Sequence, residues 1–124
     1  MRIEDPSFTV WIDDRHVIHV HAQGTWSAEI ADRYWRAFGP FLKKSRRHFG
    51  FAKVLVDRRG APVMPPALIQ AMRDGILAHY RQDDWLALVV DSSPLKSQAR
   101  QNYPLEHLEA FLSYDAALAW LTNA

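Results

Sequence analysis

The ten residues from Phe51 to Gly60, FAKVLVDRRG, constrain the fold of this chain more than any other stretch. Val54, Leu55 and Val56 form an apolar run that is too short for a helix and is typical of a strand covered on both faces. The charged residues and the glycine that follow end this strand abruptly. Ligands and partners of open α/β sheets bind beside the carboxyl ends of the strands, so the turn after this strand is the first candidate site.

Length and composition limit the class of protein. The chain has 124 residues, 48% of them hydrophobic, which suits a single domain over residues 1–124. It has no cysteine, which excludes disulfides and thiolate chemistry and favours a reducing compartment. The first residues, MRIEDPSF, lack the apolar run of a signal peptide, and no stretch has membrane-spanning length. We therefore expect a cytoplasmic protein without a membrane span.

Four further stretches predict strands around the central strand. Alternating residues predict a hairpin formed by Ser7 to Ile12 and His16 to Ala22, with the first of these strands at the sheet edge. The apolar run from Trp85 to Val90 predicts a second parallel strand, and Leu108 to Leu112 a last one.

Helix signals lie between these strands. The first helix is expected to begin at Thr25 or Ser27, and Gly39 and Pro40 should kink or split it. Later helices are expected to start at Pro66, at Ser93 with Pro94, and after Ser113. The predicted fold is α/β: an N-terminal β-hairpin, then repeated α-β units that give a mostly parallel five-stranded sheet with about four helices.

Three segments carry a resemblance to a known family: KVLVDRRG at 53–60, LALVVDSSPLKSQAR at 86–100 and FLSYDAALAWL at 111–121. With their order and spacing, the chain resembles the SpoIIAA-like family, a STAS-related group with a CRAL-TRIO/STAS-like fold. The resemblance implies a regulatory or protein-binding module. The best-known relatives are anti-sigma-factor antagonists that are phosphorylated on a serine at the start of the helix after the central strand. This chain has Val63, Met64, Pro65 and Pro66 there, so the resemblance does not extend to that switch.

Two charged corners are the candidate docking or anion site. Asp57, Arg58 and Arg59 follow the central strand. The second corner follows the next parallel strand and consists of Asp91, Ser92, Ser93 and Lys96. Free amides and hydroxyls at a helix start, with nearby positive charge, favour an anion. The alternative is that Ser93 only caps the helix and Asp91 only forms a turn.

Other clusters have ordinary structural explanations. His19 and His21 share a strand face at a spacing that allows metal binding, but no third ligand is evident, and histidines on a half-exposed strand are the alternative. The basic run from Lys43 to His48 suits either an acidic partner or the carboxyl end of a helix. Fifteen basic and fourteen acidic residues give a net charge of +1, which is too small to attract nucleic acid. We therefore expect no nucleic-acid partner. No metal or other cofactor is expected.

The leading hypothesis from the sequence is a non-catalytic module that binds a protein partner and can self-associate. No Gly-x-Ser-x-Gly, phosphate-loop or dinucleotide motif supports catalysis. The alternative is the binding or carriage of a small apolar or amphipathic, lipid-like ligand, and an enzyme is third. Trp11 and Trp26 fit the protein-binding hypothesis as interface anchors and the ligand-binding hypothesis as walls of a cavity. The alternative is that both are ordinary packing residues.

Overall fold

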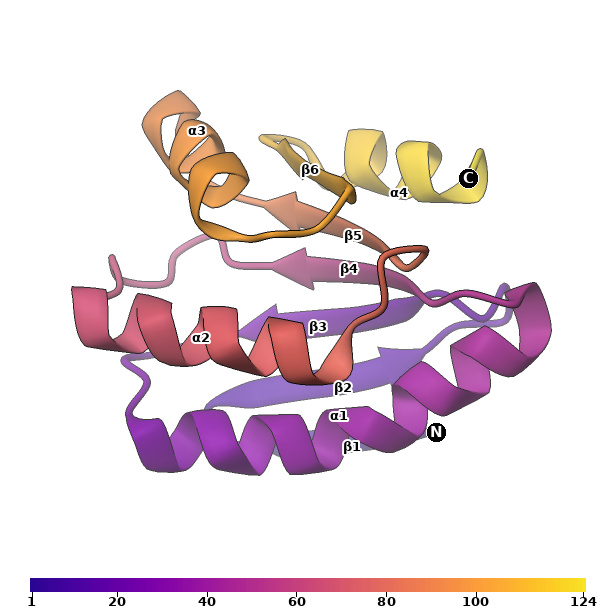
Figure 1. Cartoon of the computed structure of the whole chain (residues 1–124), viewed down its shortest axis with the longest axis horizontal. Coiled ribbons are helices and arrows are strands. Elements are labelled where there is room, and N and C mark those ends of the chain that lie inside the picture. The colour runs from indigo at the N-terminus through magenta and orange to yellow at the C-terminus, as the bar shows by residue number, and fades with distance from the viewer.

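The computed structural model describes all 124 residues and has one six-stranded sheet at its centre (Figure 1). The strands lie in sequence order, with β1 and β2 antiparallel, β2 and β3 antiparallel, and β3 to β6 parallel. Their bounds are β1 Arg2–Asp5, β2 Phe8–Ile12, β3 Ile18–Ala22, β4 Lys53–Asp57, β5 Trp85–Val89 and β6 His107–Phe111.

Four helices cover the two faces of this sheet unequally. They are α1 Ala28–Phe49, α2 Pro66–His79, α3 Ser93–Asn102 and α4 Tyr114–Thr122. Residues of α1, α2 and α3 share one large apolar core with the sheet, whereas α4 packs with a smaller core on the other face. None of these helices combines the length and the apolarity that crossing a bilayer requires.

The central strand β4 is buried on both faces, as its apolar run predicts. Val54 belongs to the large core and Leu55 to the small one, and both side chains are fully buried. Leu86 and Ala87 of β5 divide between the two cores in the same way. The parallel α/β arrangement thus follows from two short apolar strands that each need cover on both sides.

The predicted strand count was one too low, because the edge strand β1 was not predicted. Its sequence, Arg-Ile-Glu-Asp, has only Ile3 as an apolar residue, and that side chain packs against the large core. The hairpin prediction placed β2 at the edge, but β2 has β1 on its outer side. A short charged strand is typical of sheet edges, where it discourages pairing with other chains, and it gives little periodic signal.

The first helix is not split at Gly39 and Pro40. It continues through Pro40 from the Ser27 cap, whose side chain accepts a hydrogen bond from the Ile30 N–H, to Gly50. Figure 1 shows a change of direction along α1, as expected where proline removes one intrahelical hydrogen bond. Phe38 and Phe41, on either side of this point, are fully buried, and this packing holds the helix together.

Gly75 lets α2 approach α1 closely. A Cβ atom there would lie 2.2 Å from the Trp35 ring. We expect Gly75→Ala to lower the free energy of unfolding by about 1–3 kcal/mol, because overpacking outweighs the helix-propensity gain of roughly 1 kcal/mol. Gly39→Ala is the control, since nothing beyond its two chain neighbours and the backbone of its own helix lies within 4 Å of its Cβ position. Its helix-propensity gain is opposed by the unfavourable helical conformation of a residue before Pro40, so it should change stability by less than about 1 kcal/mol. Urea denaturation measures both; stabilisation by both substitutions would contradict this packing.

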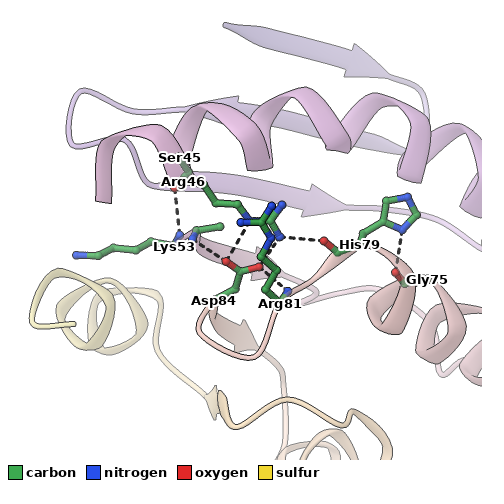
Figure 2. Close-up of polar contacts among 8 residues, drawn as sticks. Ser45, Arg46, Lys53, Gly75, His79, Arg81 and Asp84 are labelled. Carbon is green, nitrogen blue, oxygen red and sulfur yellow. Dashed lines mark hydrogen bonds and ion pairs between the residues drawn. The ribbon is translucent and has the colours of Figure 1, made fainter. Parts of the chain in front are cut away.

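A buried carboxylate joins the elements at the amino ends of β4 and β5 (Figure 2). Asp84 is fully buried and accepts hydrogen bonds from the Arg46 side chain at 2.5 and 3.2 Å and from the Ala52 and Arg81 N–H groups at 2.8 Å each. Arg46 Nη2 also donates to the His79 carbonyl at 2.9 Å. This network ties the end of α1 to the starts of two strands. It lies at the amino ends of the parallel strands, whereas the predicted site lies at their carboxyl ends.

Candidate functional site

The corner after β4 is held together by an internal ion pair. The Asp57 carboxylate accepts hydrogen bonds from the Arg59 backbone N–H, Nε and Nη2, each at 3.0 Å. Burial alone would raise the pKa of Asp57, but the hydrogen bonds from Arg59 outweigh it and lower that pKa. Arg59 also lies over the Tyr114 ring, 5.8 Å from its centroid. These two residues therefore stabilise the turn and leave only part of the guanidinium exposed.

The corner after β5 contacts this turn directly. Asp91 Oδ2 accepts a hydrogen bond from the Gly60 N–H at 2.7 Å, so the two predicted corners do meet. The cap of α3 is Ser92 rather than Ser93, because Ser92 Oγ accepts the Leu95 N–H. Ser93 is exposed and Lys96 half-buried, and neither side chain has a hydrogen bond within the protein. The carboxylate and the capping hydroxyl are thus occupied internally.

Arg58 is oriented differently from its neighbour Arg59. It is half-buried, has no carboxylate partner, and the one hydrogen bond of its side chain is a long one of 3.4 Å to the Pro62 carbonyl. Burial lowers its pKa, an effect that the nearby Tyr103 partly opposes. A guanidinium without an anion in such a place is costly, which marks Arg58 as the residue of this corner best suited to bind one.

Arg58 lies on the wall of an apolar cavity between α1, α2 and the sheet. Sixteen of the 21 lining residues are hydrophobic; those from α2 and the strands are Leu68, Met72, Ile76, Val20, Ala22, Val56, Leu86 and Leu88. The hollow measures about 760 Å³, a volume that includes open solvent at its mouth. This space suits a small molecule or a single short chain rather than a whole lipid.

The loop from Ala61 to Pro65 closes one side of this cavity. Its first four residues line both the main cavity and a smaller neighbouring one that extends toward α3, and Pro65 lines the main cavity. Arg58, Leu88 and Tyr103 also line both, so the two spaces adjoin at these residues. Val63 at the tip of this loop is 74% exposed.

Aromatic side chains of the main cavity were not predicted as site residues. Trp26, Tyr34, Trp35, Tyr80 and Tyr103 all line it. Trp26 was considered as a cavity wall, but Tyr34 and Trp35 have the spacing of ordinary core residues on the first helix. The only available signal was the excess of aromatic residues, since the cavity is formed by elements far apart in the sequence.

The two histidines on β3 lie in different environments. His19 is 5% exposed, not half-exposed as predicted, while His21 is exposed. Asp13 Oδ2 lies 2.7 Å from His19 Nε2, and the Tyr114 hydroxyl contacts Nδ1. Both ring nitrogens are thus hydrogen-bonded, Nε2 as the donor when Asp13 is ionised. Trp11 stacks on the same ring at 5.0 Å. This cluster joins the β2–β3 turn to α4.

The lowered pKa of Asp57 predicts acid sensitivity. A carboxyl group whose pKa is lower in the folded state stabilises the protein above its unfolded pKa of about 3.9 and loses that contribution as the pH falls through the folded value. We expect Asp57→Asn to be less stable than the wild type near neutral pH and to lose less stability between about pH 5 and about pH 2. Urea midpoints across this range measure it. Asp14→Asn, at an exposed residue, should follow the wild type; parallel curves for all three proteins would contradict the role of Asp57.

Comparison with known proteins supports the fold. The chain is similar to an uncharacterized protein of the DUF3478 family with a SpoIIAA-like fold from Shewanella loihica PV-4, with a TM-score of 0.68 over 98% of each chain and 16% sequence identity. No protein-family model and no curated protein sequence matches the chain. The fold is therefore SpoIIAA-like, which confirms the fold predicted from the sequence. At 16% sequence identity, this similarity supports the fold alone and assigns no function to the chain.

Proposed function

We propose that this protein binds a small amphipathic anion, with the apolar part of the ligand in the main cavity and its acidic group at Arg58. This was the alternative to a protein-binding module in the sequence analysis. The observation that carries it is a half-buried guanidinium with no carboxylate partner on the wall of an otherwise apolar cavity. An apolar pocket with few polar groups is the usual design of a small-molecule site.

The charge of the site favours a carboxylate over a more highly charged group. Arg58 is the one charged residue among those that line the main cavity. A planar guanidinium binds a carboxylate through two parallel hydrogen bonds, and the pair is neutral overall. A dianionic phosphate would leave one negative charge without a partner in apolar surroundings. A role in binding or carriage, without catalysis, is sufficient to account for these features.

Titration calorimetry with three probes of equal chain length tests this proposal. Octanoate should bind more tightly than octanol by about tenfold or more, because a hydrogen bond to a charged group contributes about 1.5–3 kcal/mol. Octylammonium should bind most weakly, since its charge repels Arg58. Equal affinities for the three probes would show binding by apolar contact alone, and failure of all three to bind would reject the proposal.

A protein partner remains the second candidate, at the surface formed by the two charged corners. Val63 has an exposed apolar side chain and lies four residues after Arg59, whose guanidinium is partly exposed. Exposed apolar and arginine side chains on one surface loop favour a protein contact. A pull-down from cell extract with Arg59→Ala and Val63→Ser variants tests this candidate. Capture of the same proteins by wild type and by both variants would argue against this surface.

A further inference from the structure

The smaller cavity beside the main one, called the second cavity below, lies on the other side of α2. It is lined by 13 residues, nine of them hydrophobic, and measures about 540 Å³, a volume that includes open solvent. Its lining includes residues of α2 and α3 and none of α1, whereas the main cavity is lined by residues of α1 and α2 and by none of α3. Figure 1 shows α2 between α1 and α3. This helix therefore has an apolar cavity along each side.

The two cavities share a single cation. Arg58 lines both, and no other charged residue lines either. Leu88 of β5 and Tyr103, just after α3, also line both, as does the loop from Ala61 to Met64. Since the side chain of Arg58 is half-buried and has no carboxylate partner, an acidic group bound to it would lie where the two apolar spaces adjoin.

A straight chain with an acid at one end makes use of only one of these spaces. The apolar lining of the other cavity then contributes nothing to binding. Each methylene group that a ligand buries raises its affinity by a factor of about four, so a second apolar arm has a large effect. An acid that is branched at the carbon next to its carboxylate places one arm in each cavity without a second charged group.

We infer, on the basis of the proposed function, that the preferred ligand is a branched carboxylic acid with two apolar arms. Its carboxylate binds Arg58, the longer arm lies in the main cavity between α1 and α2, and the shorter arm enters the second cavity between α2 and α3. The chemical class is that of carboxylic acids with an alkyl or aryl substituent on the carbon next to the carboxylate.

Three acids test this inference by calorimetry: octanoate, 2-propyloctanoate and undecanoate. The last two have the same composition and differ only in the position of the added carbons. In the wild type, 2-propyloctanoate should bind about ten- to sixtyfold more tightly than octanoate, because the propyl arm buries further methylene groups in the second cavity. It should also bind more tightly than undecanoate, whose added carbons must all find space in the main cavity.

The Gln98→Trp variant tests the position of the shorter arm. Gln98 is exposed and lines only the second cavity, so an indole there should fill the space that the arm needs. The advantage of 2-propyloctanoate over octanoate should then fall below about threefold. Ser97→Trp is the control, since this neighbouring exposed residue lines neither cavity, and it should keep the advantage seen in the wild type. Circular dichroism shows whether each variant is folded, and Ile69→Trp, which fills the second cavity from α2, repeats the test if Gln98→Trp is not.

The outcomes separate this inference from the function on which it rests. If octanoate binds but 2-propyloctanoate binds no more tightly than octanoate or than undecanoate, the second arm is wrong and the proposed function stands. If the advantage of the branched acid persists in both Gln98→Trp and Ile69→Trp, its second arm does not lie in the second cavity and the inference fails. If none of the three acids binds, the inference and the proposed function fail together.

Discussion

Replacing Asp84 with alanine is expected to lower the free energy of unfolding by about 3–5 kcal/mol. The carboxylate is fully buried, and its removal leaves the Arg46 guanidinium, whose side chain is 14% exposed, without its anion. It also leaves the N–H groups of Ala52 and Arg81 without acceptors. Because a domain of this size is stable by only about 5–15 kcal/mol, this single change should remove a large part of its stability.

Urea denaturation with two further variants separates the causes of this loss. Asp83→Ala, at the exposed neighbouring position, should change stability by less than about 0.5 kcal/mol. The double variant Arg46→Met/Asp84→Ala should lose less than the sum of the two single variants, because no unpaired charge remains buried. A loss below about 1 kcal/mol for Asp84→Ala would contradict the network drawn in Figure 2.

Replacing Arg58 with methionine should abolish the preference for an acidic ligand. We expect the affinity for octanoate to fall by about ten- to a hundredfold, with the affinity for octanol nearly unchanged, because only the charged group of the ligand meets the guanidinium. The same variant should be as stable as the wild type or more so, since it removes a partly buried cation that has no carboxylate partner. Calorimetry and urea denaturation measure the two effects.

Arg59→Met is the matched control for this experiment. Arg59 is the next residue in the chain, but its guanidinium pairs with Asp57 and does not line the cavity. Its replacement should leave octanoate affinity unchanged and lower stability slightly. Equal effects of the two substitutions on octanoate affinity would mean that the summed positive charge of the corner attracts the ligand. Arg58 would then not bind its carboxylate directly.

Much of the fold could be predicted from the sequence because local patterns specify it. Two short apolar runs became β4 and β5, and the four helix starts were marked by Ser27, by Pro66, by Ser93 with Pro94, and by Ser113. The edge strand β1 escaped prediction because only Ile3 in it faces the core. The sequence left open whether Gly39 and Pro40 kink or split α1, since the choice depends on tertiary packing of the flanking phenylalanines.

The candidate site could be predicted only as a location. The sequence places Arg58 and Arg59 side by side, and nothing local distinguishes the one that pairs with Asp57 from the one that faces the cavity. That difference depends on the path of the loop from Ala61 to Pro65 and on the position of Tyr103, far along the chain. Tyr34 and Tyr80 likewise have the spacing of core residues, and only the assembled helices place them on the cavity wall.

The five tryptophans of the chain allow the most direct test of the central claim, that the main cavity binds an amphipathic anion. Trp26 and Trp35 line the cavity, whereas Trp11, Trp85 and Trp120 do not. In an NMR titration with octanoate, we predict that the indole N–H signals of Trp26 and Trp35 shift together with the Arg58 Nε–H signal, while the other three stay in place. Shifts confined to Trp11, Trp85 and Trp120, or no shift at a saturating concentration of octanoate, would contradict the account.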